Sequence, residues 1–563
     1  MYKTIRSSVS LVCVLVFSSS LVFAGPTKQA AVATAHPLAT QVGIEILKQG
    51  GNAFDAAAAV TALLAVVEPY SSGIGGGAFW LIHRAVDNKQ IMIDGREKAP
   101  MRSRQNMYLD KSGKVIKGLS LNGPLAAGIP GVPAGIEHLV KHYGRLSLKD
   151  VLAPAIRQAE EGFAVTERYQ KLMSYRIKVV KQYPDAANIF LKGNEIPALG
   201  DVIVQKDLAK TLRTIAKNGG KGFYQGPVAR RLISSIRNNG GIWELEDLAN
   251  YQIIERTPIV VNYNGIKVTS AALPSSGGIV MGQALNILEQ FNLKSFDALT
   301  GKHIIIEAMR RAYRDRAAYL GDPDFVDIPV ERLLDKNYAE GLALTISPDH
   351  ATPSSELSEI ATSEQAGTDT THFSIVDAEG NRVSATLSIN LPFGSGFVAK
   401  GTGVLLNNEM DDFSVKPLTA NAYGLIGDHA NAIAPGKRPL SSMTPTFLET
   451  DDRIGVLGTP GGSRIISMVL LGALDFAEGN LPKSWVSLPR YHHQYFPDQV
   501  QYELGGLTVS EQERLKSKGH TLNEKNRRYG NMQAIMIWKN KNIIFAASDP
   551  RGEGAAEVIH ISK

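Results

Sequence analysis

The sequence predicts an α/β fold, and two observations support this class. First, segments with helical and strand-like patterns alternate along the whole chain, with no internal repeat or low-complexity block. Residues 55–67, for example, are rich in alanine and almost entirely apolar, which is typical of a buried helix. Second, residues 371–376 and 382–389 alternate like two strands joined by a hairpin turn at 377–381. Hydrophobic residues make up 44% of the chain, which is enough for a large core.

Further elements are expected in the first 320 residues. The glycine-rich run 73–77 precedes an apolar strand at 78–83 and lacks the lysine and hydroxyl of a phosphate loop, so we interpret it as a tight turn where backbones approach closely. A strand is expected at 91–93 and a turn before a helix at 128–133. Residues 304–320 have helical periodicity, with arginines on one face.

The first 24 residues are typical of an export signal. Lys3 and Arg6 precede a short apolar run, and the segment ends in Val22-Phe23-Ala24. We therefore predict cleavage after Ala24 and a periplasmic or secreted protein. The run is too short and too rich in serine for a membrane anchor. Cys13 is the only cysteine and leaves with this segment, which excludes disulfides, thiol nucleophiles and cysteine metal ligands.

The charge pattern gives little sign of nucleic-acid binding. The net charge is +6, and Lys3 and Arg6 of the signal contribute two of these units. We interpret the densest basic cluster, residues 525–528, as a solvated turn, and expect no nucleic-acid partner. The pairs His492-His493 and His303…Glu307 are interpreted as structural, since nothing nearby completes a metal site. No metal or organic cofactor is expected, and the lack of a Gly-x-Ser-x-Gly elbow disfavours an α/β-hydrolase.

The junction at residue 370 is the most informative part of the sequence. Residues 347–369 are rich in Ser, Thr, Glu and Pro, which predicts an exposed, mobile connector that runs straight into a strand. A threonine hydroxyl needs a base beside it, and the residue's own free α-amine, with a pKa of about 7.7–8.0, can serve. Thr370 has a free amine only after cleavage of the Asp369–Thr370 bond, and its hydroxyl could itself attack the Asp369 carbonyl.

The run Asp369-Thr370-Thr371-His372-Phe373-Ser374 resembles the maturation site of the γ-glutamyltranspeptidase family, which belongs to the amino-terminal-nucleophile hydrolases. Further blocks match the family in order: residues 94–97, 128–131, 321–325, 386–390, 406–414, 438–443 and 460–464. The resemblance covers nearly all of the mature chain. It implies a four-layer αββα sandwich in which a large subunit, 25–369, and a small catalytic subunit, 370–563, pair as a heterodimer and share one core.

The resemblance also implies the roles of the catalytic residues. Thr370 matches the nucleophile that forms a γ-glutamyl ester. Gly461 and Gly462 match the pair whose backbone N–H groups form the oxyanion hole, where a side chain would block the carbonyl oxygen. Ser388 stands near the nucleophile where many relatives have threonine, and it keeps the hydroxyl. Asp369 precedes the cleaved bond where some relatives have glutamine or asparagine.

The substrate-binding residues follow from the same resemblance. They are Arg96, Ser441 and Ser442 for the α-carboxylate, Asn390, Glu409 and Asp412 for the α-ammonium, and Tyr423 in a loop at 420–430 that covers the site in bacterial relatives. Taken singly, these residues have simpler interpretations. Arg96-Glu97 fits a surface ion pair, Asp411-Asp412 fits acids at a helix start, and the serine and glycine pairs fit plain turns.

The expected reaction transfers a γ-glutamyl group to Thr370 and then to water or to an amino-acid or peptide amine, with glutathione as the expected donor. Two alternatives within enzymes are a β-lactam side-chain acylase and a poly-γ-glutamate depolymerase. The loop at 420–430 argues against the acylase-like branch that lacks it. An exported protein that binds γ-glutamyl ligands without turnover is the alternative from another class.

Overall fold

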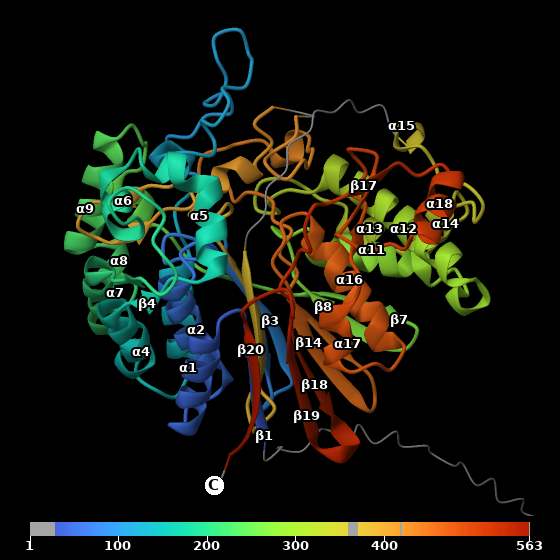
Figure 1. Ribbon diagram of the computed structural model, residues 1–563, viewed down its shortest axis with the longest axis horizontal. Helices are drawn as coiled ribbons and strands as arrows, with labels where there is room; N and C mark the ends of the chain where they lie inside the picture. The colour runs from blue at the N-terminus through green and yellow to red at the C-terminus, as the bar shows by residue number, and fades with distance from the viewer. Residues whose placement is uncertain (1–28, 358–369, 417–418, 562–563) are drawn as a thin grey trace, which may run out of the picture.

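The computed structural model describes residues 29–357, 370–416 and 419–561. Two sheets lie face to face between two layers of helices, which confirms the expected four-layer αββα sandwich (Figure 1). Helices α1 to α9 lie on one side of the sheets and α11 to α18 on the other (Figure 1). The predicted signal at 1–24 and the residue Asp369 lie outside the described residues.

Both large sheets are antiparallel. The first has the order β20 (Ala555–His560), β1 (Gln29–Thr34), β9 (Thr371–Val376), β10 (Arg382–Ser388), β2 (Gly77–Arg84), β3 (Lys89–Gly95) and β6 (Ile254–Arg256). The second has the order β19 (Ile543–Ser548), β18 (Gln533–Trp538), β14 (Arg453–Gly458), β13 (Thr446–Glu449), β8 (Ile266–Ser270) and β7 (Ile259–Tyr263). Strands from before and after residue 370 therefore share each sheet.

The helices form two groups that follow the order of the sequence, except that the second group has members on both sides of residue 370. The first group comprises α1 (Pro37–Lys48), α2 (Ala53–Val67), α3 (Val132–Tyr143), α4 (Leu148–Glu161), α5 (Glu167–Val180), α6 (Pro184–Phe190), α7 (Lys206–Asn218), α8 (Lys221–Tyr224), α9 (Gly226–Asn238) and α10 (Leu245–Ala249). The second comprises α11 (Gly277–Leu288), α12 (Ala298–Tyr319), α13 (Val330–Leu333), α14 (Lys336–Ala343), α15 (Ser354–Leu357), α16 (Arg464–Ala477), α17 (Pro482–Ser487) and α18 (Val509–Ser517). Within the described ranges, no helix combines the length and the apolarity needed to cross a membrane.

Strand β2 shows why the sequence builds four layers. Its side chains alternate between two cores, with Trp80 and Ile82 against the first helical layer and Phe79 and Leu81 on the side of the second sheet. A strand buried on both faces needs apolar residues at every position. Helix α2 packs on this sheet with every residue buried, and its Thr61 hydroxyl accepts a hydrogen bond from the Trp80 indole at 3.1 Å.

The glycine-rich run 73–77 is a close-packed turn, as predicted. A Cβ atom on Gly76 would lie 2.2 Å from the carbonyl oxygen of Ser388. Only glycine allows the backbone to approach the end of β10 this closely. The turn therefore helps to fix the end of the β9–β10 hairpin, which pairs in the predicted antiparallel arrangement.

The described part of the connector predicted from residue 347 is exposed at positions 349, 350, 353, 355 and 356, as predicted, whereas Ser354 is buried. The hydroxyl of Ser354 accepts a hydrogen bond from Arg310 at 2.6 Å and donates one to the carbonyl of Tyr495 at 2.8 Å. The carbonyl of Ser347 is bonded to His303 at 2.8 Å. Polar residues in this segment thus bind buried partners on α12 and in the second half of the chain.

Candidate functional site

Thr370 lies immediately before β9 and is only 3% exposed. Because Leu387 of β10 pairs with Thr371, the register carries Ser388 to the position opposite Thr370. The Ser388 hydroxyl accepts a hydrogen bond from the backbone N–H of Asn390 at 2.8 Å. The end of the hairpin thus brings together three residues that the sequence predicted for the site.

Two carboxylates approach this point from the short 3₁₀ helix Glu409–Asp412. Asn407 fixes the start of this helix: its Nδ2 donates to the carbonyls of Gly75 and Gly128 at 2.7 and 2.8 Å, and its Oδ1 accepts the N–H of Glu409 at 2.9 Å. One buried amide therefore ties the acidic segment to two turns of the first half of the chain.

Arg96 lies against both carboxylates. Its side chain is 1% exposed, and its guanidinium donates to Glu409 and, at 2.5 Å, to Asp412. Its Nε also donates to the carbonyl of Pro439 at 3.1 Å. Burial opposes the guanidinium charge, but Glu409 and Asp412 outweigh this effect and raise the pKa of Arg96. The interpretation of Arg96-Glu97 as a surface pair is excluded, since both side chains are buried.

The acids keep unused hydrogen-bonding capacity. Burial raises the pKa of Glu409 to about 7 despite the lowering effect of Arg96, and burial likewise raises the pKa of Asp412. Asn390 donates its Nδ2 to the carbonyl of Asn408 at 2.9 Å, which leaves its Oδ1 as an acceptor. This Oδ1 and Glu409 Oε2 are buried and have no hydrogen-bond partner among the described residues. Buried acceptors without donors are costly, and a bound ammonium would satisfy both.

Gly461 and Gly462 lie just before α16, with φ angles of +148° and +59°. A Cβ on Gly462 would lie 2.2 Å from the ring of Tyr423, whose hydroxyl donates to the carbonyl of Asn390 at 2.7 Å. Neither glycine N–H donates a hydrogen bond to any described residue. Two such N–H groups at the start of a helix can stabilise a developing oxyanion.

Sequence reasoning missed Arg316 of α12. Its Nε donates to Ser276 at 3.0 Å and its Nη2 to the hydroxyl of Ser442 at 3.3 Å. Burial lowers the pKa of Arg316 to about 10, which still leaves the guanidinium charged at neutral pH. Its only signal in the sequence was the row of arginines in the predicted helix 304–320. A guanidinium beside the Ser441-Ser442 pair suits a carboxylate ligand.

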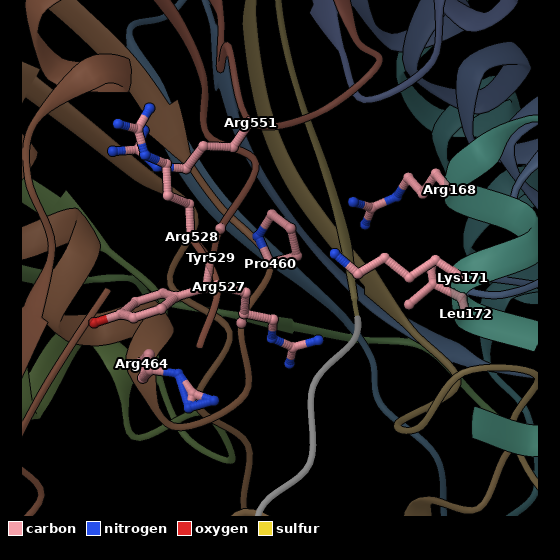
Figure 2. Close-up of a pocket in the computed structure, with 11 residues that line it drawn as sticks. Arg168, Lys171, Leu172, Pro460, Arg464, Arg527, Arg528, Tyr529 and Arg551 are labelled. Carbon is pink, nitrogen blue, oxygen red and sulfur yellow. The ribbon is translucent and has the colours of Figure 1, made fainter. Parts of the chain in front are cut away.

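These residues line one cavity. Its lining comprises Arg316, Thr370, Ser388, Asn390, Glu409, Asp412, Tyr423, Leu425, Leu440, Ser441, Ser442, Met443, Gly462, Ser463 and Ile465. Of the residues predicted for the site, only Gly461 and Arg96 of the described chain do not line it. Gly461 lines a second pocket (Figure 2), and Arg96 reaches the cavity through its two carboxylate partners.

The sequence indicated no third group beside His303 and Glu307, but the structure brings one there. His520 lies beside them, and the three buried ligand groups are within 4.8 Å of one another. Glu307, however, already pairs with Arg310 at 3.1 Å and Arg311 at 2.7 Å. Its charge is neutralised by two guanidinium groups, so the arrangement is typical of a buried hydrogen-bonded cluster.

Comparison with known proteins gives consistent matches. The family model described as Gamma-glutamyltranspeptidase matches residues 39–559. The glutathione hydrolase proenzyme of Pseudomonas sp. strain A14 is 43% identical over 533 residues, covering 92% of each chain. That of Escherichia coli K12 is 42% identical, covering 93% of this chain and 90% of the relative.

Solved structures match as well. A cephalosporin acylase from Bacillus halodurans has a TM-score of 0.82 and 30% identity, with 99% of each chain covered. Helicobacter pylori gamma-glutamyltranspeptidase is 45% identical with a TM-score of 0.56, and the match covers 57% of this chain and 93% of that one.

Proposed function

The chain belongs to the gamma-glutamyltranspeptidase family, and from this premise we propose that it is a γ-glutamyltransferase and glutathione hydrolase activated by cleavage of its own Asp369–Thr370 bond. The observation that carries the proposal is the cavity that joins Thr370, Gly462 and unpartnered acceptors suited to an ammonium. Cleavage yields a large subunit, 25–369, and a small subunit, 370–563, which remain paired through shared sheets.

Thr370 attacks the γ-carbonyl of the donor through its hydroxyl oxygen, and its α-amine accepts the proton. The N–H groups of Gly461 and Gly462 stabilise the oxyanion, and the amine leaves with a proton as the C–N bond breaks. Water or a second amine then attacks the ester carbonyl and restores the Thr370 hydroxyl. Ser388 stands opposite Thr370 in the strand register, and we assign its hydroxyl the role of orienting the attacking oxygen.

Recognition depends on the two charges at the free end of a γ-linked glutamate. The α-ammonium binds Asn390 Oδ1, Glu409 and Asp412. The ammonium pairs with Glu409 and Asp412 in place of Arg96. The guanidinium of Arg96 then becomes available to bind the α-carboxylate. Ser441 and Ser442 assist at the same carboxylate, and Tyr423 covers the bound group. An α-linked peptide cannot present both charges in this way.

The variant Thr370→Ala tests both processing of the precursor and turnover of the substrate. The variant should give one uncut band on a denaturing gel and no hydrolysis of a γ-glutamyl anilide, because one hydroxyl performs both tasks. The wild type should give two bands, the smaller beginning Thr-Thr-His-Phe on amino-terminal sequencing. An uncut wild type that turns over the anilide would contradict the proposal, and an uncut, inactive wild type would favour the non-catalytic binding protein.

A substrate that lacks the α-ammonium distinguishes a γ-glutamyltransferase from the acylase alternative. A glutaryl anilide has the same acyl chain without this group, so it leaves Asn390 Oδ1 and Glu409 Oε2 unpaired. We expect its kcat/KM to be at least about 100-fold below that of the γ-glutamyl anilide. Equal rates on the two anilides would support an acylase. Export through removal of residues 1–24 is part of the proposal, and amino-terminal sequencing of the large chain tests it.

A further inference from the structure

Gln494 is a buried amide that contacts two residues of the cavity but does not line it. Its Oε1 accepts hydrogen bonds from the hydroxyl of Ser463 at 2.7 Å and from Nε2 of His492 at 2.8 Å. Its Nε2 donates to the carbonyl of Tyr423 at 3.3 Å and to that of Phe496 at 3.2 Å. Because an amide has two acceptor and two donor positions, the hydrogen-bonding capacity of this side chain is fully used.

The surroundings of Gln494 allow only one orientation of its amide. Its Nε2 faces two carbonyl oxygens, so a rotation by 180° would place oxygen against oxygen. His492 is neutral at pH 7, because burial lowers its pKa to about 3. The amide oxygen can only accept, so the single ring proton is on Nε2, and Nδ1 accepts from the hydroxyl of Ser467 at 2.6 Å. The position of the amide oxygen is therefore fixed by buried partners.

The two cavity contacts of Gln494 reach different parts of the site. Ser463 is the N-cap residue of α16 and directly follows the glycine pair. A serine at this position commonly accepts a backbone N–H of its helix, but within the described chain the Ser463 hydroxyl caps no N–H of α16 and donates to Gln494 instead. Tyr423 belongs to the loop 420–430, and its ring packs against Gly462. One amide therefore ties this loop, here called the covering loop, to the end of the glycine turn.

We propose that Gln494 is a positioning residue that holds the covering loop and the glycine turn fixed relative to each other during the reaction. This inference rests on the proposed function. The covering loop encloses the γ-glutamyl group before and during the reaction, so the contact with Tyr423 supports binding of the donor. The glycine N–H groups act on an oxyanion that forms only in the transition state, so the contact with Ser463 supports the chemical step.

Gln494→Glu separates the two contacts. A carboxylate keeps the acceptor oxygen that faces Ser463, but it places a second oxygen against the carbonyl of Tyr423. The KM for a γ-glutamyl anilide should therefore rise about five- to tenfold, while kcat should stay within about twofold of the wild-type value. The two-band pattern on a denaturing gel shows that the variant has folded and processed.

Gln512→Glu is the matched control. Its Nε2 donates to the carbonyl of Leu507 at 3.1 Å, and it does not line the cavity. The same chemical change therefore removes a donor to a carbonyl outside the site, and KM and kcat should both stay at the wild-type values.

Ser463→Ala removes the opposite contact of the same amide. The covering loop keeps its hydrogen bond from Gln494, whereas the start of α16 loses its own. We expect kcat to fall about three- to tenfold with little change in KM. A general loss of structure would not shift KM in one variant and kcat in the other. An unchanged KM in Gln494→Glu, or the same kinetic change in both variants, overturns the inference.

Proteolysis gives a measurement that does not depend on turnover. Tyr423 is 8% exposed, so chymotrypsin can cut after it only when the covering loop opens. The rate of this cut should be about five- to tenfold higher in Gln494→Glu than in the wild type or in Gln512→Glu, and sequencing identifies the fragment that begins Gly-Leu-Ile. If Gln494→Glu stays unprocessed, the same rate is compared with that of Thr370→Ala.

An equal rate of this cut in Gln494→Glu and its reference protein also overturns the inference. Hydrolysis of the anilide by the wild type reports on the proposed function alone. The failure of the positioning role is therefore distinguishable from the failure of the γ-glutamyltransferase assignment.

Discussion

At the scale of single residues, the protonation of Glu409 should control donor binding near neutral pH. Its pKa is raised to about 7 by burial, and only the ionised form attracts an ammonium. The KM for a γ-glutamyl anilide should therefore rise in the wild type as the pH falls from 8 to 6. In Glu409→Gln, KM should be higher and should vary little over this range. The measurement is KM against pH for both proteins, and parallel pH profiles would exclude Glu409 from this role.

Gly462 should tolerate no side chain. A Cβ would meet the Tyr423 ring at 2.2 Å, and φ is +59°. Gly462→Ala should shift both the N–H and the ring, and lower kcat by about 100-fold, as expected for the loss of an oxyanion-hole donor. Gly505→Ala provides a control for backbone strain, since its φ is +70° and nothing lies near its Cβ. Equal activity in the two variants would count against the assignment.

The sequence predicted most of the site because the residues lie in short ordered blocks that resemble one family. Thr370 also followed from chemistry, since a strand that begins at a threonine directly after a connector suits an amino-terminal nucleophile. Arg316 could not be identified this way. The predicted helix presented several arginines, and only the packing of α12 shows that Arg316 reaches Ser442 while Arg310 binds Ser354.

At the scale of elements, α12 holds the segment that precedes the proposed cleavage site. The carboxylate of Glu307 forms ion pairs with both Arg310 and Arg311. Its Oε2 also accepts a hydrogen bond from the N–H of Thr352 at 3.4 Å. Glu307→Gln should leave the buried guanidinium of Arg311 with no countercharge and that of Arg310 with Asp498 alone, and lower the free energy of unfolding by about 3–5 kcal/mol. Urea unfolding measures this loss. Glu331→Gln, an exposed glutamate of the same helical layer, should change it little.

The elements themselves were predictable where the composition or the alternation of residue types is distinctive. Helix α2 and the β9–β10 hairpin have patterns that only one kind of element satisfies, and both were predicted within a few residues. The polar composition of the connector indicated its exposed residues but not the buried Ser354. Its hydrogen bonds go to His303, Arg310 and Tyr495, and no local pattern reveals such distant partners.

At the scale of the whole molecule, buried histidines should make the protein acid-sensitive. Burial lowers the pKa of His372 and His492 to about 3 and that of His493 to about 4. Between pH 6.5 and 4 the unfolded chain binds protons at these rings that the folded chain does not, so the free energy of unfolding falls as the pH is lowered. The thermal midpoint should drop over this range. His372→Gln should make the drop shallower, and an equal slope would exclude its contribution.

The interleaving of the sheets has a consequence for how the enzyme must be made. Strand β9 lies between β1 and β10, so each half of the chain supplies the neighbours that the other half lacks. If residues 370–563 were synthesised alone, their strands would have unpaired edges and their core would be only partly covered. A protein in that state is prone to aggregation. Synthesis as one polypeptide lets both halves condense together at high effective concentration, and the cut can come later because it severs a linkage that the finished fold no longer needs.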